Sequence, residues 1–291
     1  MKTRIITGAV LVVVLVGVLL VVPKIGAAYA FGLLCAIGAH ELLWATGLVK
    51  EKRLVVYTAV AAFLVPVWCG YGMNYLWGLC LGLMFTAVLF GELLHSKAQL
   101  PVGQLALCYV GGLVIPYLLS ALIRLLSYDT GRFLVVVPFV LAFLSDTGAY
   151  FTGRFLGKHK LSPIISPKKT VEGVVGGVAA AILGMLVYCL VVENAFHLEV
   201  NYLYAAVYGL VGSFAGVFGD LCFSAIKRQV GIKDYGHLMP GHGGVLDRCD
   251  SVCSVAPRTE VWMLLIPVVK EYGKMCKYPG LHRLHRPAGP G

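Results

Sequence analysis

Residues 5–22 read IITGAVLVVVLVGVLLVV, an uninterrupted apolar run of 18 residues. As a helix, this run would extend about 27 Å, close to the hydrocarbon thickness of a bilayer. Lys2 and Arg4 precede it, as basic residues precede a secretion signal. The run is nevertheless long for a signal peptide, and Pro23-Lys24 offers no small-residue cleavage site. We therefore expect a retained first transmembrane helix.

Apolar runs of similar length recur along the chain. They cover approximately residues 26–48, 55–72, 75–94, 103–125, 133–156, 173–192 and 202–226. The 291 residues are 59% hydrophobic and 13% charged, with a mean hydropathy of +0.84, whereas soluble domains carry about 25% charged residues. This composition excludes a water-soluble globular fold. It predicts an all-α, polytopic integral membrane protein with about eight or nine transmembrane helices.

Small residues recur at helical spacing within two of these runs. Gly173, Gly176 and Gly177 lie in one, and Gly209-x-x-Gly212-x-x-x-Gly216 lies in the other. Such spacing is typical of helices that pack closely in lipid.

No large polar block interrupts the runs, so we expect a single membrane-embedded catalytic domain over residues 1–256. Residues 257–291 form an atypical C-terminal segment, in which a short apolar run at 261–269 precedes a basic tail. That apolar run is too short to cross a bilayer.

The charges are distributed unevenly between alternate loops. The chain carries 24 basic and 14 acidic residues, a net charge of +10. With a cytoplasmic N-terminus, the basic segments 50–53, 92–97, 154–169 and 227–248 all fall on the cytoplasmic side, as the positive-inside rule requires. This predicts a multi-pass protein of the inner (cytoplasmic) membrane, with the two longest polar loops, 154–172 and 227–256, facing the cytoplasm.

Carboxylates lie beside one of these loops. Asp220, Ser224 and Lys227 follow the spacing i, i+4, i+7, which places them on one face of a helix. An ionisable group such as Asp220 within an apolar helix points to function. Asp247 and Asp250 would share a face if their segment is helical.

A basic, glycine-rich segment separates these two groups of carboxylates. Gly241-His-Gly-Gly244 permits the close backbone approach that phosphate-binding loops need. Carboxylate oxygens suit Mg²⁺, and lysine and arginine suit phosphates. The combination favours a nucleoside triphosphate bound with Mg²⁺.

Residues 224–250 also resemble the signature of a known family. They follow the pattern S-x-x-K-R-x4-K-D-x-G-x3-P-x-H-G-G-x-x-D-R-x-D, which is similar to that of the bacterial phosphatidate cytidylyltransferases, or CDP-diacylglycerol synthases. Residues 144–150 (LSDTGAY) and 166–173 (SPKKTVEG) resemble two further segments of that family. The sequence departs from the family at Cys249, where a larger apolar residue is usual, and at Val171, where tryptophan is frequent. The specific motifs are confined to 144–250.

The resemblance implies transfer of a cytidylyl group from CTP to phosphatidate, with Mg²⁺, giving CDP-diacylglycerol and pyrophosphate in phospholipid biosynthesis. The implied partners are CTP, phosphatidate and the lipid bilayer, without nucleic acid, and a homodimer is compatible with it. The implied catalytic residues are Asp220, Asp247, Asp250, Lys227 and Arg248, with Asp220 and Asp247 as metal ligands. The implied substrate-binding residues are Lys168, Lys169, Ser224, Arg228, Lys233, Asp234, His242, Gly243, Gly244 and Asp146.

The chemistry of this reaction suits such a set of residues. The nucleophile is a lipid phosphate oxygen, already ionised at neutral pH because the second pKa of a phosphomonoester is about 6. No general base is needed, and positioning and cationic stabilisation of the leaving pyrophosphate become the main tools.

Other functions fit parts of the sequence. A transporter or channel would also place polar residues in glycine-rich helices, but here the polar motifs are concentrated in the second half without a counterpart in the first. A CTP-dependent polyprenol kinase or a CDP-archaeol-type synthase would share the membrane, CTP and Mg²⁺. A nucleic-acid or scaffold role does not fit an embedded chain.

Several charged residues also have ordinary interpretations. Lys50, Lys52 and Arg53 are interpreted as topology signals. Glu41 and Glu92, each near a histidine at a helix end, are interpreted as interfacial side chains. Asp146 fits either a functional group or a polar residue hydrogen-bonded to a neighbouring helix.

Overall fold

The computed structural model describes residues 15, 17–97, 99–236 and 243–269. Within them, seven helical segments are long and apolar enough to cross a membrane. These are Lys24–Trp44, Lys52–Gly70, Tyr75–His95, Val102–Leu125, Gly131–Leu156, Val171–Phe196 and Tyr202–Gln229. They coincide within a few residues with the seven apolar runs after the first, which confirms the all-α polytopic membrane fold. Most of the 5–22 run lies outside the described residues.

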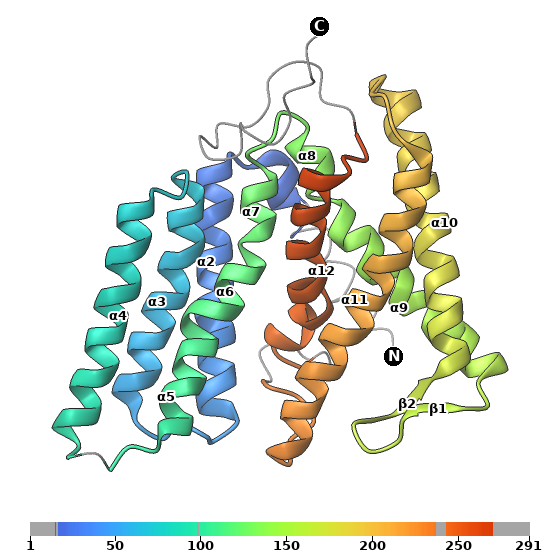
Figure 1. Ribbon diagram of the computed structural model, residues 1–291. Helices are drawn as coiled ribbons and strands as arrows, with labels where there is room; N and C mark the ends of the chain where they lie inside the picture. Colours follow the sequence, from blue (N-terminus) through green and yellow to red (C-terminus); the bar gives the residue numbers. More distant parts are fainter. Residues whose placement is uncertain (1–14, 16, 98, 237–242, 270–291) are drawn as a thin grey trace, which may run out of the picture.

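The segments form a bundle of roughly parallel and antiparallel helices (Figure 1). One side contains α2 (Lys24–His40), α3 (Lys52–Gly70) and α4 (Tyr75–His95). The fourth segment is divided into α5 (Val102–Tyr109), α6 (Ile115–Leu119) and α7 (Ala121–Leu125). The other side contains α8 (Gly131–Leu134), α9 (Val137–Leu156), α10 (Val171–Phe196) and α11 (Tyr202–Gln229).

Two short stretches of π-helix interrupt the α-helices. One, Glu41–Ala45, continues α2, and the other, Val110–Val114, joins α5 to α6. A π-helical stretch adds a residue to the turn and redirects the side chains that follow, and such stretches occur frequently at functional sites. The first of them carries Glu41.

Small residues allow α9, α10 and α11 to pack closely. A Cβ atom added to Gly177 of α10 would lie 2.8 Å from the Ser145 carbonyl oxygen of α9, and one added to Gly209 of α11 would lie 2.5 Å from Cα of Ile182. Only glycine permits these approaches. The hydroxyl groups of Ser145 and Ser213 are 2.6 Å apart and join α9 to α11 through a buried hydrogen bond.

A further helix, α12 (Leu246–Leu265), lies between α6 and α11 in Figure 1. It is not among the seven apolar segments, because charged residues lower its hydropathy. It continues without a break across residue 256 and through Pro257. The domain boundary expected at residue 256 therefore falls inside a helix, and the division of the chain into two segments stays a prediction.

A buried ion pair fixes the far end of α12. The Arg124 guanidinium donates from Nε to Oε1 of Glu260 at 2.6 Å and from Nη2 to Oε2 at 2.7 Å. It also donates to the Tyr117 carbonyl oxygen at 3.0 Å and lies 4.3 Å from the centroid of the Tyr117 ring. This two-point pairing satisfies both charges inside the bundle.

The basic loops meet at one end of the bundle, the lower end in Figure 1. There, β1 (Lys160–Ser162) and β2 (Ser166–Thr170) form an antiparallel hairpin between α9 and α10. The Thr170 hydroxyl accepts a hydrogen bond from the Gly173 N–H at 3.1 Å and caps α10. The connection from α11 to α12 lies at the same end, so the two longest polar loops are neighbours.

Candidate active site

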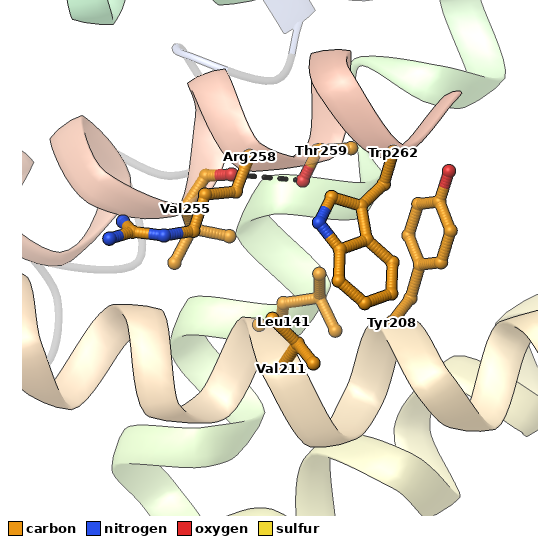
Figure 2. Close-up of a pocket in the computed structure, with 8 residues that line it drawn as sticks. Leu141, Tyr208, Val211, Val255, Arg258, Thr259 and Trp262 are labelled. Atoms are coloured by element: carbon orange, nitrogen blue, oxygen red, sulfur yellow. Dashed lines mark hydrogen bonds between the residues drawn. The ribbon is translucent and has the colours of Figure 1, made fainter. Parts of the chain in front are cut away.

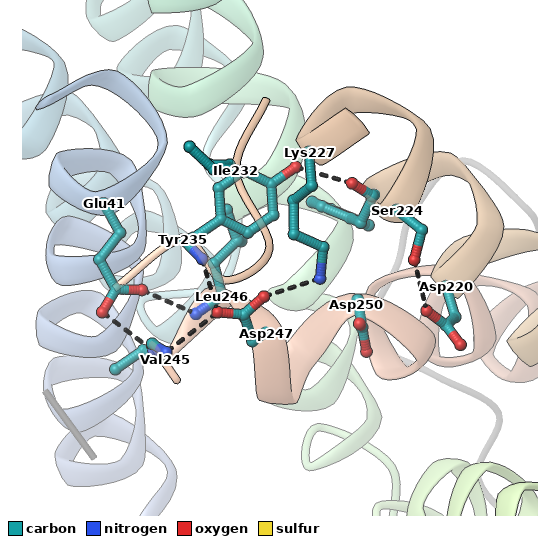
Figure 3. A network of polar contacts seen from close by, with 12 residues as sticks. Glu41, Asp220, Ser224, Lys227, Ile232, Tyr235, Val245, Leu246, Asp247 and Asp250 are labelled. Atoms are coloured by element: carbon teal, nitrogen blue, oxygen red, sulfur yellow. Dashed lines mark hydrogen bonds and ion pairs between the residues drawn. The ribbon is translucent and has the colours of Figure 1, made fainter. Parts of the chain in front are cut away.

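The C-terminal part of α11 presents its polar residues on one face, as the sequence spacing predicted. The Ser224 hydroxyl donates to Oδ1 of Asp220 at 3.0 Å, one turn earlier in the helix (Figure 3). One turn later, Nζ of Lys227 lies 2.7 Å from Oδ1 of Asp247 in α12. The three residues thus face α12 together.

Both oxygens of the Asp247 carboxylate accept hydrogen bonds. In addition to the ammonium group of Lys227, its Oδ2 accepts from the backbone N–H of Tyr235 at 2.7 Å and of Gly244 at 3.0 Å. The side chain of Asp247 is only 2% exposed. Asp247 therefore joins the end of α11, the loop and the start of α12, and both of its oxygens are occupied by hydrogen bonds.

Tyr235 covers this ion pair from the loop. Its ring is completely buried, its hydroxyl donates to the Phe223 carbonyl oxygen at 3.0 Å, and the Lys227 ammonium lies 5.3 Å from the ring centroid. Burial, together with the negative charges of Asp247 and Asp250, raises the pKa of the Tyr235 phenol well above its usual range. The phenol therefore stays protonated and keeps donating its hydrogen bond.

Glu41 corrects one interpretation of the sequence. It is not an interfacial side chain but is buried, with 5% exposure. Its Oε1 accepts from the backbone N–H of Val245 and its Oε2 from that of Leu246, both at 3.0 Å. These N–H groups belong to the first turn of α12, which has no other side-chain cap. A carboxylate is well placed at this positive end of a helix dipole.

Gly243 and Gly244 allow these carboxylates to approach the backbone. A Cβ atom on Gly244 would lie 2.3 Å from Oε2 of Glu41. Gly243 has a φ of +81°, and a Cβ atom there would lie 2.8 Å from Oδ2 of Asp247. We call Glu41, Lys227, Tyr235 and Asp247 the loop anchor, because together they hold the glycine-rich segment against α11 and α12.

A second group of carboxylates lies beside the loop anchor. Asp146 of α9, Asp220 of α11 and Asp250 of α12 are close enough to repel one another electrostatically. We call these three residues the carboxylate cluster. Asp220 is paired with Lys169 of β2, at 2.5 Å from Oδ2 to Nζ, and the charge of Arg248 partly offsets that of Asp146. Tertiary packing thus brings together three acids from three helices.

The β1–β2 hairpin supplies cations to the same end of the bundle. Lys169 reaches Asp220, while Lys168, the preceding residue in β2, is exposed. The Arg228 guanidinium at the end of α11 donates to the carbonyl oxygen of Ile165, in the hairpin turn, at 3.2 Å, and to that of Ile232 at 3.3 Å. Arg228 therefore connects the two polar loops.

The remaining predicted residues differ in how they are placed. Arg248, Lys233 and Asp234 are exposed at this end of the bundle. His242 lies outside the described residues.

A comparison of the sequence with known families identifies the group to which the chain belongs. The model of the cytidylyltransferase family matches residues 2–266, which include every element described above. The chain belongs to the cytidylyltransferase family.

Individual relatives in this family match a shorter part of the chain. The sequence is 43% identical over 109 residues to a phosphatidate cytidylyltransferase of Staphylococcus epidermidis, covering 38% of this chain and 40% of the relative. It is 46% identical over 102 residues to a phosphatidate cytidylyltransferase of Bacillus subtilis, covering 35% of this chain and 36% of the relative. The matched part therefore spans about two fifths or less of the length of these relatives.

In the described part of the chain, no three histidine, cysteine, aspartate or glutamate side chains converge closely enough to hold an ion as they stand. The carboxylate cluster nevertheless has the oxygen donors that Mg²⁺ prefers. Among the described residues, Asp250 accepts a hydrogen bond only from the adjacent Ser251 N–H, which leaves it more oxygen lone pairs for a ligand than Asp247 has.

Glu41 and Tyr235 are the members of the loop anchor that sequence analysis missed, and Glu41 is the more informative case. A signal existed, since an acidic residue at the C-terminal end of an apolar helix is placed unfavourably with respect to the helix dipole and needs another partner. The partner is more than 200 positions away in the sequence, and only folding identifies it.

Proposed function

We propose that this protein transfers a cytidylyl group from CTP to phosphatidate, giving CDP-diacylglycerol and pyrophosphate, at the cytoplasmic face of the inner membrane. The observation that carries the proposal is the carboxylate cluster, placed beside a glycine-rich loop and the cations of a hairpin at the basic end of a membrane bundle. Membership of the cytidylyltransferase family and the names of the matched relatives support the same reaction.

The carboxylate cluster is the proposed Mg²⁺ site. Asp220 and Asp250 would hold the ion, with Asp146 beside them, because their repulsion is relieved by a bound cation. When bound, Mg²⁺ would neutralise charge on the triphosphate. This assignment differs from the sequence-based expectation for Asp247, whose two oxygens already accept three hydrogen bonds. We assign Asp247 to the loop anchor instead.

The cations around the cluster are the proposed phosphate ligands. Lys169 is paired with Asp220, and its ammonium group would bind a phosphate oxygen of the nucleotide. The exposed side chains of Lys168, Lys233 and Arg248 would contact the outer phosphates. Gly243 and Gly244 would let the nucleotide approach the backbone, and Ser224 would orient Asp220.

The transfer itself needs little proton chemistry. An ionised phosphate oxygen of phosphatidate attacks the α-phosphorus of CTP, a new P–O–P bond forms, and the bond to the β-phosphate oxygen breaks. The electron pair leaves with pyrophosphate, whose charge the surrounding cations stabilise. The residues of this chain therefore act by holding two anions in line and not by removing a proton.

The proposal is tested by incorporation of labelled CTP into chloroform-extractable lipid. Purified protein in detergent is given Mg²⁺ with phosphatidate, with phosphatidylcholine, or with a polyprenol or polyprenyl phosphate. We expect incorporation with phosphatidate alone, with one pyrophosphate released per labelled lipid. Incorporation only with a polyprenol substrate would assign the same site to another lipid, and absence of CTP binding and turnover with every lipid would contradict the proposal. Arg132→Gln, an exposed substitution on α8, is the control for nonspecific effects of charge removal.

A further inference from the structure

A groove of 490 Å³ runs between α11 and α12, and Leu118 of α6 contributes to its lining. Phe218 and Val261 line it and are 58% and 50% exposed on the outer surface of the bundle. Phe218 belongs to the segment Tyr202–Gln229, which is long and apolar enough to cross a membrane, and Val261 lines the same groove from α12. The groove therefore faces the lipid, and its volume is in the range of sites that bind small organic molecules.

Arg258 is the charged residue in the lining of this groove. Its Nη1 donates to the Ser254 carbonyl oxygen at 2.9 Å and to the Ser254 hydroxyl, and its guanidinium carbon lies 5.7 Å from the centroid of the Phe218 ring. In Figure 2 the guanidinium points away from the rings of Trp262 and Tyr208. No carboxylate within 4.0 Å pairs with it among the described residues, whereas Arg124 is paired with Glu260.

An unpaired cation at membrane depth is costly and indicates a ligand or a path. Arg258 lies two turns beyond Asp250, about 12 Å along the axis of α12. Its guanidinium turns back to Ser254, only one turn from Asp250. Solvation of the guanidinium by water would not by itself require a groove beside Arg258.

One end of the groove is lined by sequence neighbours of the carboxylate cluster. Gly219 and Cys222 line it, and they flank Asp220 in α11. A Cβ atom on Gly219 would lie 2.7 Å from the Asp250 carbonyl oxygen and from Cβ of Ser254, so α11 and α12 are in close contact at this point. The groove therefore begins beside Asp220 and Asp250 and continues toward Trp262 along an apolar wall.

From this placement we infer that the groove between α11 and α12 binds an anionic glycerophospholipid, with Arg258 contacting the lipid phosphate and an acyl chain lying along the groove toward Trp262. The inference deepens the proposed function and rests on it for the identity of the lipid as substrate. It makes Arg258 a residue that selects the lipid by charge.

Such a site would distinguish anionic from zwitterionic lipids by their charge. A guanidinium forms charge-assisted, two-point hydrogen bonds with a phosphate. In phosphatidylcholine, an attached quaternary ammonium group would compensate the phosphate and would bring a second cation toward Arg258. Like charges at low dielectric repel strongly, so we expect exclusion of the zwitterionic lipid.

Fluorescence of Trp262 tests binding without requiring activity. The full-length protein is placed in nanodiscs that contain a low fraction of lipid brominated on its acyl chains, either phosphatidate or phosphatidylcholine. The contribution of Trp262 is the difference between the parent protein and Trp262→Phe. We expect brominated phosphatidate to quench Trp262 at least about twice as strongly, and Arg258→Gln to abolish this preference while Arg258→Lys keeps part of it.

Kinetics provide a second measurement on the same variants. Arg258→Gln is expected to raise the apparent KM for phosphatidate at least about tenfold, as for loss of a charged hydrogen bond, with the KM for CTP changed less than about twofold. Arg132→Gln removes an exposed arginine elsewhere and should change neither value.

Failure of this inference can be separated from failure of the proposed function. Equal quenching by the two brominated lipids in the parent protein, or a preference that survives Arg258→Gln, overturns the inference even if cytidylyl transfer occurs. A phosphatidate preference that depends on Arg258 supports it even if the transferred group proves to differ. An equal rise of both KM values would also overturn it.

Discussion

The Glu41 carboxylate accepts a hydrogen bond from the Val245 N–H at 3.0 Å and thereby joins the end of α2 to the start of α12. Its second oxygen serves the neighbouring N–H of Leu246. The carboxylate is enclosed, since Cβ atoms on Gly236 or Gly244 would lie within 2.5 Å of it. The placement of Gly244 and of the start of α12 therefore depends on a residue from the opposite half of the sequence.

Glu41→Gln is predicted to destabilise the protein and slow the transfer. The amide offers one acceptor, and its NH₂ group would face one of two backbone N–H donors. One buried N–H then loses its partner, which lowers the free energy of unfolding by about 1–3 kcal/mol. Displacement of the loop should reduce cytidylyl transfer more than about tenfold. Denaturant unfolding in detergent and the CTP assay measure the two effects.

Glu92→Gln is the matched control for this substitution. Glu92 is half-buried at the end of α4 and, within the described part of the chain, accepts only a long hydrogen bond, 3.3 Å, from the Tyr57 hydroxyl. We expect changes below about 0.5 kcal/mol and little effect on turnover. If both variants behaved alike, Glu41 would have no special role in holding the loop.

Asp247 and Lys227 are predicted to act as a coupled pair in stability. Because Lys227 is buried and Asp247 is its partner, Asp247→Asn leaves an uncompensated cation, and Lys227→Met leaves an uncompensated carboxylate. Each should lower the free energy of unfolding by about 3–5 kcal/mol. The double variant should lose clearly less than the sum of the two. Additive losses in this cycle would argue against a direct interaction.

Asp220 and Asp250 are predicted to affect metal binding and not folding. Asp220→Asn and Asp250→Asn should each raise the Mg²⁺ concentration for half-maximal activity more than about tenfold, because each removes a charged oxygen ligand. Mn²⁺ titration followed by electron paramagnetic resonance provides a readout independent of turnover. Their unfolding free energies should stay within about 1 kcal/mol of the parent. A normally folded Asp247→Asn variant with the same metal defect would restore Asp247 as a ligand.

The Arg124–Glu260 pair is predicted to stabilise the far end of α12. Glu260→Gln leaves the Arg124 guanidinium buried without a counter-charge and should lower the unfolding free energy by about 3–5 kcal/mol. Replacing both residues, as Arg124→Met with Glu260→Leu, should recover most of this loss, since apolar groups often substitute for a buried pair. Thermal unfolding in detergent distinguishes the variants, and a double variant no more stable than the single one would contradict the prediction.

Much of the bundle followed from local sequence. Segments such as 75–94 and 202–226 are apolar over the thickness of a bilayer. Because backbone N–H and C=O groups in lipid must be hydrogen-bonded within the protein, such segments form helices when the alternating pattern of a β-barrel is absent. The shared face of Asp220 and Ser224 also followed, because helical periodicity fixes which residues lie above one another.

The roles of the carboxylates in the site could be predicted from the sequence only in part. Sequence spacing identified Asp220, Asp247 and Asp250 together, and the family resemblance implied Asp220 and Asp247 as the metal ligands. The fold separates them by their partners, since Asp247 accepts three hydrogen bonds and Asp250 accepts one, from its neighbour. The number of lone pairs left for a ligand depends on the backbone N–H groups that tertiary packing brings near.

The sequence by itself determined that this chain is an all-α membrane protein with carboxylates, cations and glycines concentrated near one end. Hydropathy and helical period are local properties, and they require no knowledge of neighbouring segments. Only the tertiary structure decided that Glu41 holds the start of α12, that Asp146 joins Asp220 and Asp250, and that Arg258 lines a lipid-facing groove. These relationships join residues from different helices, and their energies depend on burial and distance, which exist only once the helices have packed.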